Sequence, residues 1–380
     1  MKNELQFSKD GKLKILQVSD PQDLKFVRHA MTDMLSVAYD TIKPDLVVFT
    51  GDNILGNHLL DRRIGQGHFA EGKEATLESM KLSLHHILAP LQNRNIPNAM
   101  IYGNHDDMNL ITKDEQADIY RGYSCCMEMN TDDKSVDCDT YSIALKDENG
   151  QTRFNIFMLD SAWQDKEGER KCHTVVKKET VEWYKKESKR LRDENGGENV
   201  PSLMFLHIPL PEIMELTEEC DENVDFALPD ELNKGKFIHL NGAKARGYML
   251  EFPSILTDSN GLFDAVKDEG NVLAIINGHD HKNNFIGKVD GVDMISTGCA
   301  SFRCYGDKRT RGVRLFEINI DGSYKTKFFT HEDLCGRNIK TNLKYVNDAD
   351  EFAYKKWISI GVAGVTALVG TAAAIICKKK

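Results

Sequence analysis

The sequence has no CxxC pair, no N-x-S/T sequon and no internal repeat, and these absences narrow the class of protein. The missing CxxC spacing argues against a structural zinc site, and nine cysteines, an odd number, fit reduced thiols better than a disulfide framework. A local disulfide among Cys125, Cys126, Cys138 and Cys172 stays open only for an oxidising compartment. Residues 1–20 also lack the apolar core of a signal peptide, so we expect a domain that stays outside the secretory lumen.

Positive charge is scarce as well. The chain of 380 residues has 49 Lys and Arg against 59 Asp and Glu, which gives a net charge of -10. Because nucleic-acid backbones are bound by clustered Lys and Arg, we expect no nucleic-acid partner. A hydrophobic content of 41% and a charged content of 28% are typical of a globular protein with an ample core.

One long uncharged run stands apart from the rest of the chain. Residues 357–377 contain no charged side chain, and lysines flank the run on both sides, which predicts a single-pass transmembrane helix rather than a buried core helix. Five positive residues from Arg337 to Lys356 against three at 378–380 place the large domain on the cytoplasmic side of a membrane. Thr366, Gly370 and Ala374 form a small-residue stripe, which predicts weak helix-mediated dimer formation.

The remaining sequence predicts an α/β fold. Short apolar runs bounded by polar clusters are typical of strands that are buried on both faces, and they occur at 13–18, 45–50, 98–102, 202–206 and 271–276. Helical patterns at 26–39, 75–91 and 177–197 alternate with them. Asn149-Gly150 and Asp321-Gly322 predict two hairpins, so we expect mixed sheets.

The predicted domain organisation follows from these elements. Residues 1–345 form one catalytic domain, with long surface insertions at 121–139 and 212–248. Residues 346–356 are a polar linker, 357–377 the transmembrane helix and 378–380 a basic tail.

Polar side chains follow each of the five predicted strands. They are Asp20, Asp52, Asn104 with His105, His207, and His279 with His281. Ligands of open α/β sheets bind outside the carboxyl ends of the strands, so one edge of the fold could bring these donors together. Carboxylate and amide oxygens mixed with imidazoles suit Mn, Fe, Zn or Co, and a carboxylate such as Asp52 can bridge two ions.

The order of these motifs resembles that of the calcineurin-like metallophosphoesterases. "SDPQ" at Ser19, "GDN" at Gly51, "GNHD" at Gly103, His207 and "GHDH" at Gly278 follow the family sequence D-x-H, G-D, G-N-H-D, H and G-H-x-H. "HIPLPE" and "SFRCYGDKRTRGVRLFEI" are similar to the purple-acid-phosphatase-like branch, and the resemblance covers residues 13–329. One position departs from the pattern, because Gln22 stands where the family usually has a histidine. An amide oxygen is a weaker donor, which puts the identity of the first metal in doubt.

The resemblance implies a four-layer αββα sandwich of two mixed sheets, the metallo-dependent phosphatase fold, and a dinuclear site for two divalent ions. Asp20, His281 and Gln22 would hold the first ion, Asp52 would bridge, and Asn104, His207 and His279 would hold the second. His105 would face the substrate and protonate the leaving group, with Asp106 orienting it. The implied reaction is hydrolysis of phosphate esters by attack of a metal-bound hydroxide, on a small molecule, a phosphoprotein or a phospholipid head group.

Two other functions compete with this one. A catalytically weak scaffold of the same fold could bind phosphorylated partners, but such a scaffold has no need of His105 and Asp106. A nucleotide-binding loop at Gly67 to Glu74 matches G-x-x-x-x-G-K, yet it lacks the Ser or Thr that holds magnesium. His58 and His68 follow the bridging Asp52 in sequence and are candidates for substrate contacts.

Overall fold

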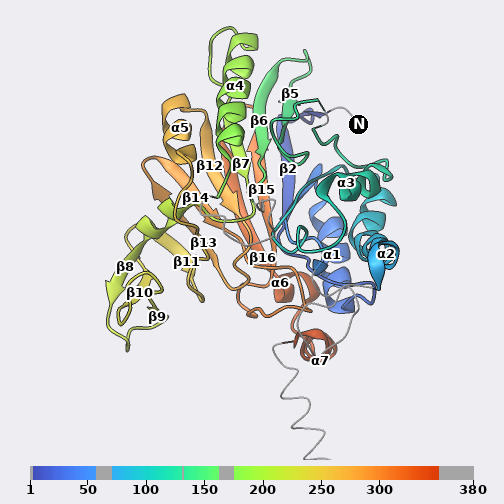
Figure 1. The fold of residues 1–380 in the computed structure, drawn as a ribbon, viewed down its shortest axis with the longest axis vertical. Coiled ribbons are helices and arrows are strands. Elements are labelled where there is room, and N and C mark those ends of the chain that lie inside the picture. The colour runs from blue at the N-terminus through green and yellow to red at the C-terminus, as the bar shows by residue number, and fades with distance from the viewer. Residues whose placement is uncertain (1–2, 57–70, 131, 162–174, 351–380) are drawn as a thin grey trace, which may run out of the picture.

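Two mixed β-sheets lie face to face in the middle of the molecule, with helices on both outer surfaces (Figure 1). The computed structural model describes residues 3–56, 71–130, 132–161 and 175–350. Within these residues the α/β class and the two mixed sheets are confirmed, and the layers follow the order helix, sheet, sheet, helix.

The five-stranded sheet has the order β16-β15-β2-β3-β4. Its parallel strands β2, β3 and β4 alternate in sequence with helices α1 and α2, and its antiparallel pair β15–β16 is the hairpin predicted at Asp321-Gly322. Every residue of β3 and β4 is buried, which explains why these strands are apolar apart from Thr50 and Asn98. The bounds are β2 Lys12–Val18, β3 Leu46–Thr50, β4 Asn98–Ile101, β15 Gly312–Asn319, β16 Tyr324–Thr330, α1 His29–Ile42 and α2 Gly72–Gln92.

The eight-stranded sheet has the order β1-β5-β6-β7-β12-β14-β13-β11. Side chains alternate between its faces, so Phe205 and Ile276 enter the core between the sheets, whereas Met204 and Ile275 pack with Tyr184 of helix α4. The bounds are β1 Glu4–Gln6, β5 Tyr141–Lys146, β6 Thr152–Met158, β7 Ser202–Phe205, β11 Ala245–Tyr248, β12 Val272–Asn277, β13 Asn284–Val289, β14 Val292–Ser296, α4 Lys178–Glu194 and α5 Leu262–Glu269.

A small antiparallel sheet, β8-β10-β9, extends from the side of the molecule next to β11 and β13 (Figure 1). It accounts for most of the insertion expected at 212–248, although β11 belongs to the large sheet. The bounds are η2 Pro211–Leu216, β8 Thr217–Cys220, β9 Leu228–Pro229 and β10 Phe237–Leu240; the remaining helices are α3 Lys113–Arg121, α6 His331–Cys335 and α7 Ile339–Asp348.

The prediction of a surface insertion at 121–139 is wrong. Cys126, Met127 and Met129 are buried in the main core, and the Asn98 N–H donates to the Cys125 carbonyl at 2.9 Å. The segment therefore runs along β4, the last strand of the five-stranded sheet, and covers an edge that would otherwise expose unpaired backbone groups. Among the described residues, the structure has free thiols at Cys125, Cys126, Cys138, Cys220, Cys304 and Cys335.

The predicted linker begins too early. Helix α7 continues to Asp348, whose carboxylate accepts a hydrogen bond from the Ala30 N–H at 2.8 Å, and Arg28 pairs with Asp350 at 2.8 Å. Asp348 thus satisfies a backbone donor in the first turn of α1, which has no capping side chain of its own. The predicted span at 357–377, with its small-residue stripe, lies outside the described residues, and no helix within them is long and apolar enough to cross a membrane.

Candidate metal centre

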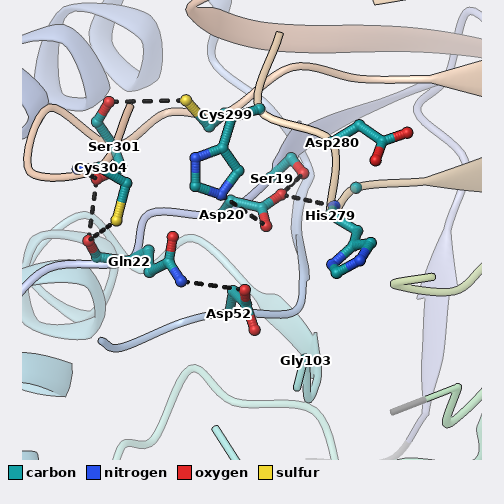
Figure 2. Close-up of polar contacts among 12 residues, drawn as sticks. Ser19, Asp20, Gln22, Asp52, Gly103, His279, Asp280, Cys299, Ser301 and Cys304 are labelled. Atoms are coloured by element: carbon teal, nitrogen blue, oxygen red, sulfur yellow. Dashed lines mark hydrogen bonds and ion pairs between the residues drawn. The ribbon is translucent and has the colours of Figure 1, made fainter. Parts of the chain in front are cut away.

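Five strands from both sheets deliver the predicted ligands to one place. Asp20, Asp52 and Asn104 follow strands β2, β3 and β4 of one sheet, and His207, His279 and His281 follow β7 and β12 of the other. Contacts between these segments cross from sheet to sheet. His207 Nδ1 lies 2.9 Å from the Thr50 carbonyl, and the His279 N–H donates to Asp20 Oδ2 at 3.0 Å. Figure 2 shows Asp20 meeting His279, and Gln22 meeting Asp52, from separate segments of the chain.

The ligand atoms fall into two groups that share one carboxylate. Asp20, Asp52 and His281 offer atoms that all lie within 4.8 Å of one another, and so do Asp52, His207 and His279. Asn104 joins the second group, because its Oδ1 lies 3.1 Å from His207 Nε2. Asp52 is therefore placed to serve both groups, as the bridging role requires.

The imidazoles present lone pairs to these groups. A carbonyl oxygen can only accept, so the contacts of His207 Nδ1 with Thr50 (2.9 Å) and of His281 Nδ1 with Tyr305 (3.0 Å) place the proton of each neutral ring on Nδ1. The Nε2 lone pair of His207 then lies 3.5 Å from Asp52 Oδ1, and that of His281 lies 3.7 Å from Asp20 Oδ1. Burial lowers the pKa of His207, His279 and His281 to about 3, so all three rings are neutral near pH 7.

Two buried oxygen atoms without hydrogen-bond partners indicate whether the candidate site suits cations. Asp20 Oδ1 and Gln22 Oε1 have no hydrogen-bond partner among the described residues, although both side chains are at most 1% exposed. Burial also raises the pKa of the Asp20 carboxyl well above its ordinary value. Buried acceptors that face other acceptors are costly unless a cation lies between them. The donor set of oxygen and imidazole fits divalent transition metals. Gln22 Nε2 donates to Asp52 Oδ2 at 3.1 Å, which leaves Oε1 as the atom of this amide that a cation could take.

Backbone strain is also concentrated in the residues of the ligand set. Four residues of the ligand set have φ angles in the left-handed region, which is uncommon outside glycine: Asp20 (46°), Gln22 (22°), Asp52 (46°) and His279 (70°). At two glycines of the motifs, the side chain of a ligand residue comes so close to the backbone that a Cβ would not fit. A Cβ on Gly51 would meet the His207 ring, and one on Gly103 would meet the Asp52 carboxylate.

His105 lies at the mouth of the site. Its Nε2 is 4.0 Å from Asp52 Oδ2, its side chain is 25% exposed, and its backbone N–H donates to Asp52 Oδ1 at 2.8 Å. A cavity of about 280 Å³ opens here, lined by Gln22, Asp52, Leu55, His105, His279, His281, Cys304 and Tyr305. Two larger cavities, of about 430 and 500 Å³, contain none of the predicted ligands.

Asp106 has a different role from the one expected. Its carboxylate accepts hydrogen bonds from the backbone N–H groups of Gly103 (2.8 Å), Asn53 (3.0 Å) and Ile54 (3.2 Å). These contacts tie the loop after β4 to the loop after β3. Asp106 therefore holds together the backbone that carries Asp52, Asn104 and His105, rather than orienting the imidazole of His105.

A loop that the sequence reasoning left without a role surrounds the first ligand group. In residues 299–305, the Ala300 and Ser301 N–H groups donate to the Ser19 (2.7 Å) and Asp20 (3.1 Å) carbonyls, and Ser301 Oγ donates to the Gln22 carbonyl at 2.9 Å (Figure 2). The Tyr305 ring also stacks on His281, with 4.3 Å between centroids. In the sequence, the feature that could have indicated this role was the polar cluster after the buried strand at 292–296.

Arg311 connects this loop to the C-terminal helix. Its Nη2 donates to the Cys304 carbonyl at 3.2 Å, and its Nη1 donates to the Tyr345 hydroxyl of α7 at 2.8 Å. The guanidinium also lies over the Phe302 ring, 4.7 Å from its centroid. Arg311 is fully buried, so these contacts fix the loop around the first ligand group against α7.

The other sequence motifs contribute little to the candidate metal centre. Lys73 of the G-x-x-x-x-G-K match lies in the first turn of α2 and pairs with Glu115 at 2.6 Å. Gly67, His58 and His68 lie outside the described residues.

The two sheets and the ligand groups that share Asp52 fit the fold of a metal-binding phosphoesterase, and comparison with known proteins identifies the family. The model of the calcineurin-like phosphoesterases matches residues 13–283, so the chain belongs to that family. An Arabidopsis thaliana protein named probable inactive purple acid phosphatase 29 is 25% identical, covering 86% of this chain and 82% of its own. The Saccharomyces cerevisiae phosphatase DCR2 is 25% identical over 80% of this chain and 47% of its own. A solved dimetal phosphatase from Danio rerio aligns with a TM-score of 0.47 and 13% identity, covering 84% of this chain and 99% of that one.

We predict that Gln22→His tightens binding of the first metal by at least ~10-fold, the lower end of the range for groups that tune metal sites. An imidazole is a stronger donor than an amide oxygen for transition metals. Calorimetric titration of the metal-free protein with Mn²⁺ and Zn²⁺ measures the change, and Gln22→Ala, which lacks a donor, should weaken the same site. Equal affinities in all three proteins would show that Gln22 does not face the metal.

We also predict that Arg311→Met weakens the first metal site by roughly 10–100-fold, the usual effect of losing an outer-shell contact. The second site, with Asn104, His207 and His279, should keep its affinity, because the loop that Arg311 holds meets the segments of the first ligand group. Metal content after dialysis, measured by mass spectrometry, separates the two sites. Arg309→Met is the matched control, since Arg309 is two residues from Arg311 in sequence but pairs with Asp307 at the surface. Equal loss of both metals would indicate general unfolding instead.

Proposed function

We propose that this chain hydrolyses phosphate esters at a site for two divalent ions, with Mn, Fe, Zn and Co as candidates. The observation that supports it most is the pair of ligand groups that share Asp52 and open into the cavity beside His105. When bound, two such ions supply the positive charge that polarises a phosphoryl group and activates water. Gln22, Asp20 and His281 would hold one of them, and Asn104, His207 and His279 the other.

His105 supplies the proton in this proposal. Its imidazole lines the cavity and is partly exposed, and its Nε2 lies 4.0 Å from Asp52 Oδ2 of the bridging carboxylate, which places the ring beside the position of a bound ester. A proton delivered by Nε2 to the departing oxygen would lower the barrier to its release. Asp106 assists by holding the backbone of the loop that carries His105.

A second candidate function is a phospho-ligand-binding scaffold with little catalysis. The word "inactive" in the name of the Arabidopsis thaliana relative favours it, whereas the yeast relative is named a phosphatase. The complete ligand set and the accessible His105 favour the enzyme. The phosphorylated substrate is a small molecule, a phosphoprotein or a phospholipid head group.

We propose in addition that residues 357–377 anchor the chain in a membrane as a single span, with the catalytic domain on the cytoplasmic side. The absence of charge over that run and the lysines on both sides support the location. An anchored domain would meet membrane-near substrates at a high local concentration.

A panel of phosphomonoesters and phosphodiesters tests the proposed activity. Protein reconstituted with Mn²⁺ or Zn²⁺ should release phosphate, and Asp52→Asn should reduce turnover by several orders of magnitude because it removes the charge shared by both ion sites. Circular dichroism checks that the variant is folded. Binding of phosphorylated ligands without turnover by the wild-type protein would favour the scaffold instead.

His105→Ala should lower the rate by about 10²–10⁴-fold, the usual contribution of general acid catalysis, while the metal content stays near that of the wild type. The loss should shrink for aryl esters with good leaving groups, since these need little protonation. Comparing kcat for p-nitrophenyl phosphate and an alkyl phosphate measures this difference. Parallel loss of metal would move His105 into the ligand set and contradict its role as an acid.

A further inference from the structure

Helix α7 exposes its apolar side chains. Ile339 is 78% exposed, Leu343 66% and Val346 42%. These positions are spaced i, i+4 and i+7, so they form one stripe along the helix. In a helix on the surface of a globular domain, such a stripe normally faces the core, and an exposed one indicates a contact surface.

The opposite face of α7 packs against the domain. Tyr345 and Asp348 are buried there: the Tyr345 hydroxyl accepts from Arg311, and the Asp348 carboxylate accepts from the Ala30 N–H. Lys344 also pairs with Asp33 of α1. Rolling the helix to bury its apolar stripe would break these contacts, so the stripe of Ile339, Leu343 and Val346 points outward in the folded domain.

The surroundings of the stripe suit a lipid surface. Lys340 is exposed in the first turn of the helix, and Arg337, which is exposed just before the helix, pairs with Glu332 at 3.2 Å. The uncharged run at 357–377 follows soon after the last residue of the helix, Asp348. An apolar stripe with basic flanking residues is the pattern of helices that lie in the boundary between head groups and acyl chains. A second copy of the chain is a poorer fit, because a 10-residue helix offers much less than the ~800 Å² per partner that stable interfaces bury.

We infer that α7 is an interfacial helix, with the stripe of Ile339, Leu343 and Val346 in the surface of an anionic bilayer. The inference rests on the proposed membrane location and not on the proposed catalysis. It has a structural consequence: the helix that meets the lipid also holds, through Tyr345 and Arg311, the loop that lines the metal cavity. The catalytic domain would then have one fixed orientation relative to the bilayer.

Site-specific photo-crosslinking in the full chain tests the inference. Leu343, and in a second variant Ile339, is replaced by p-benzoylphenylalanine, and the protein is reconstituted into phosphatidylcholine–phosphatidylserine vesicles that contain a fluorescent phospholipid. Lys189 on α4 is the control position, because its side chain is 66% exposed and α4 lies at the end of the molecule away from α7 (Figure 1). Illumination should give a fluorescent adduct at positions 343 and 339 that is several-fold stronger than at 189.

Each other outcome overturns the inference in a recognisable way. A crosslinked band of twice the mass would assign the stripe to a second copy of the chain. Equal labelling at 343 and 189 in a chain that floats with the vesicles would leave the membrane span in place but remove α7 from the surface. A chain that does not float would reject the membrane location itself. Phosphatase activity, measured on the same samples, reports separately on the proposed catalysis.

Discussion

The site depends on a concentration of buried hydrogen-bond acceptors that the chain does not neutralise by itself. Asp20 and Asp52 lie among three imidazoles that burial keeps neutral, and Asp20 Oδ1 and Gln22 Oε1 lack partners within the described residues. In an interior of low dielectric such groups repel one another, and divalent cations are the simplest source of compensation. The left-handed backbone at four of the ligands is a second cost that metal binding can offset.

Hydrogen bonds to backbone groups hold this arrangement together. Asp106 joins the loops after β3 and β4, and residues 299–305 join the segments that carry Asp20, Gln22 and His281. These hydrogen bonds use N–H donors at fixed positions. They therefore restrict the movement of the ligand side chains, and the donors themselves do not bind cations. The loop at 299–305 is held in turn by Arg311 and Tyr345, so α7 supports the first ligand group.

These contacts also explain why α7 supports the loop beside the ligand groups and yet exposes an apolar stripe. Its polar residue Asp348 completes the first turn of α1, and Tyr345 holds Arg311, which leaves the apolar stripe without a place in the core. Helix α7 therefore couples the loop that lines the cavity, through Tyr345 and Arg311, to the first turn of α1.

Much of this protein could be predicted from its sequence. The apolar runs, the hairpin turns and the polar residues at five strand exits depend on local chemistry, so the α/β class, the mixed sheets and the ligand candidates were all predictable. The family resemblance already implied that Asp52 would bridge the two groups. The sequence could not show that Asp106 binds backbone instead of His105, or that residues 121–139 cover the edge of β4. Those features arise from contacts between segments far apart in the chain, where hydrogen-bond geometry and burial, and not residue type, decide which partner each group finds.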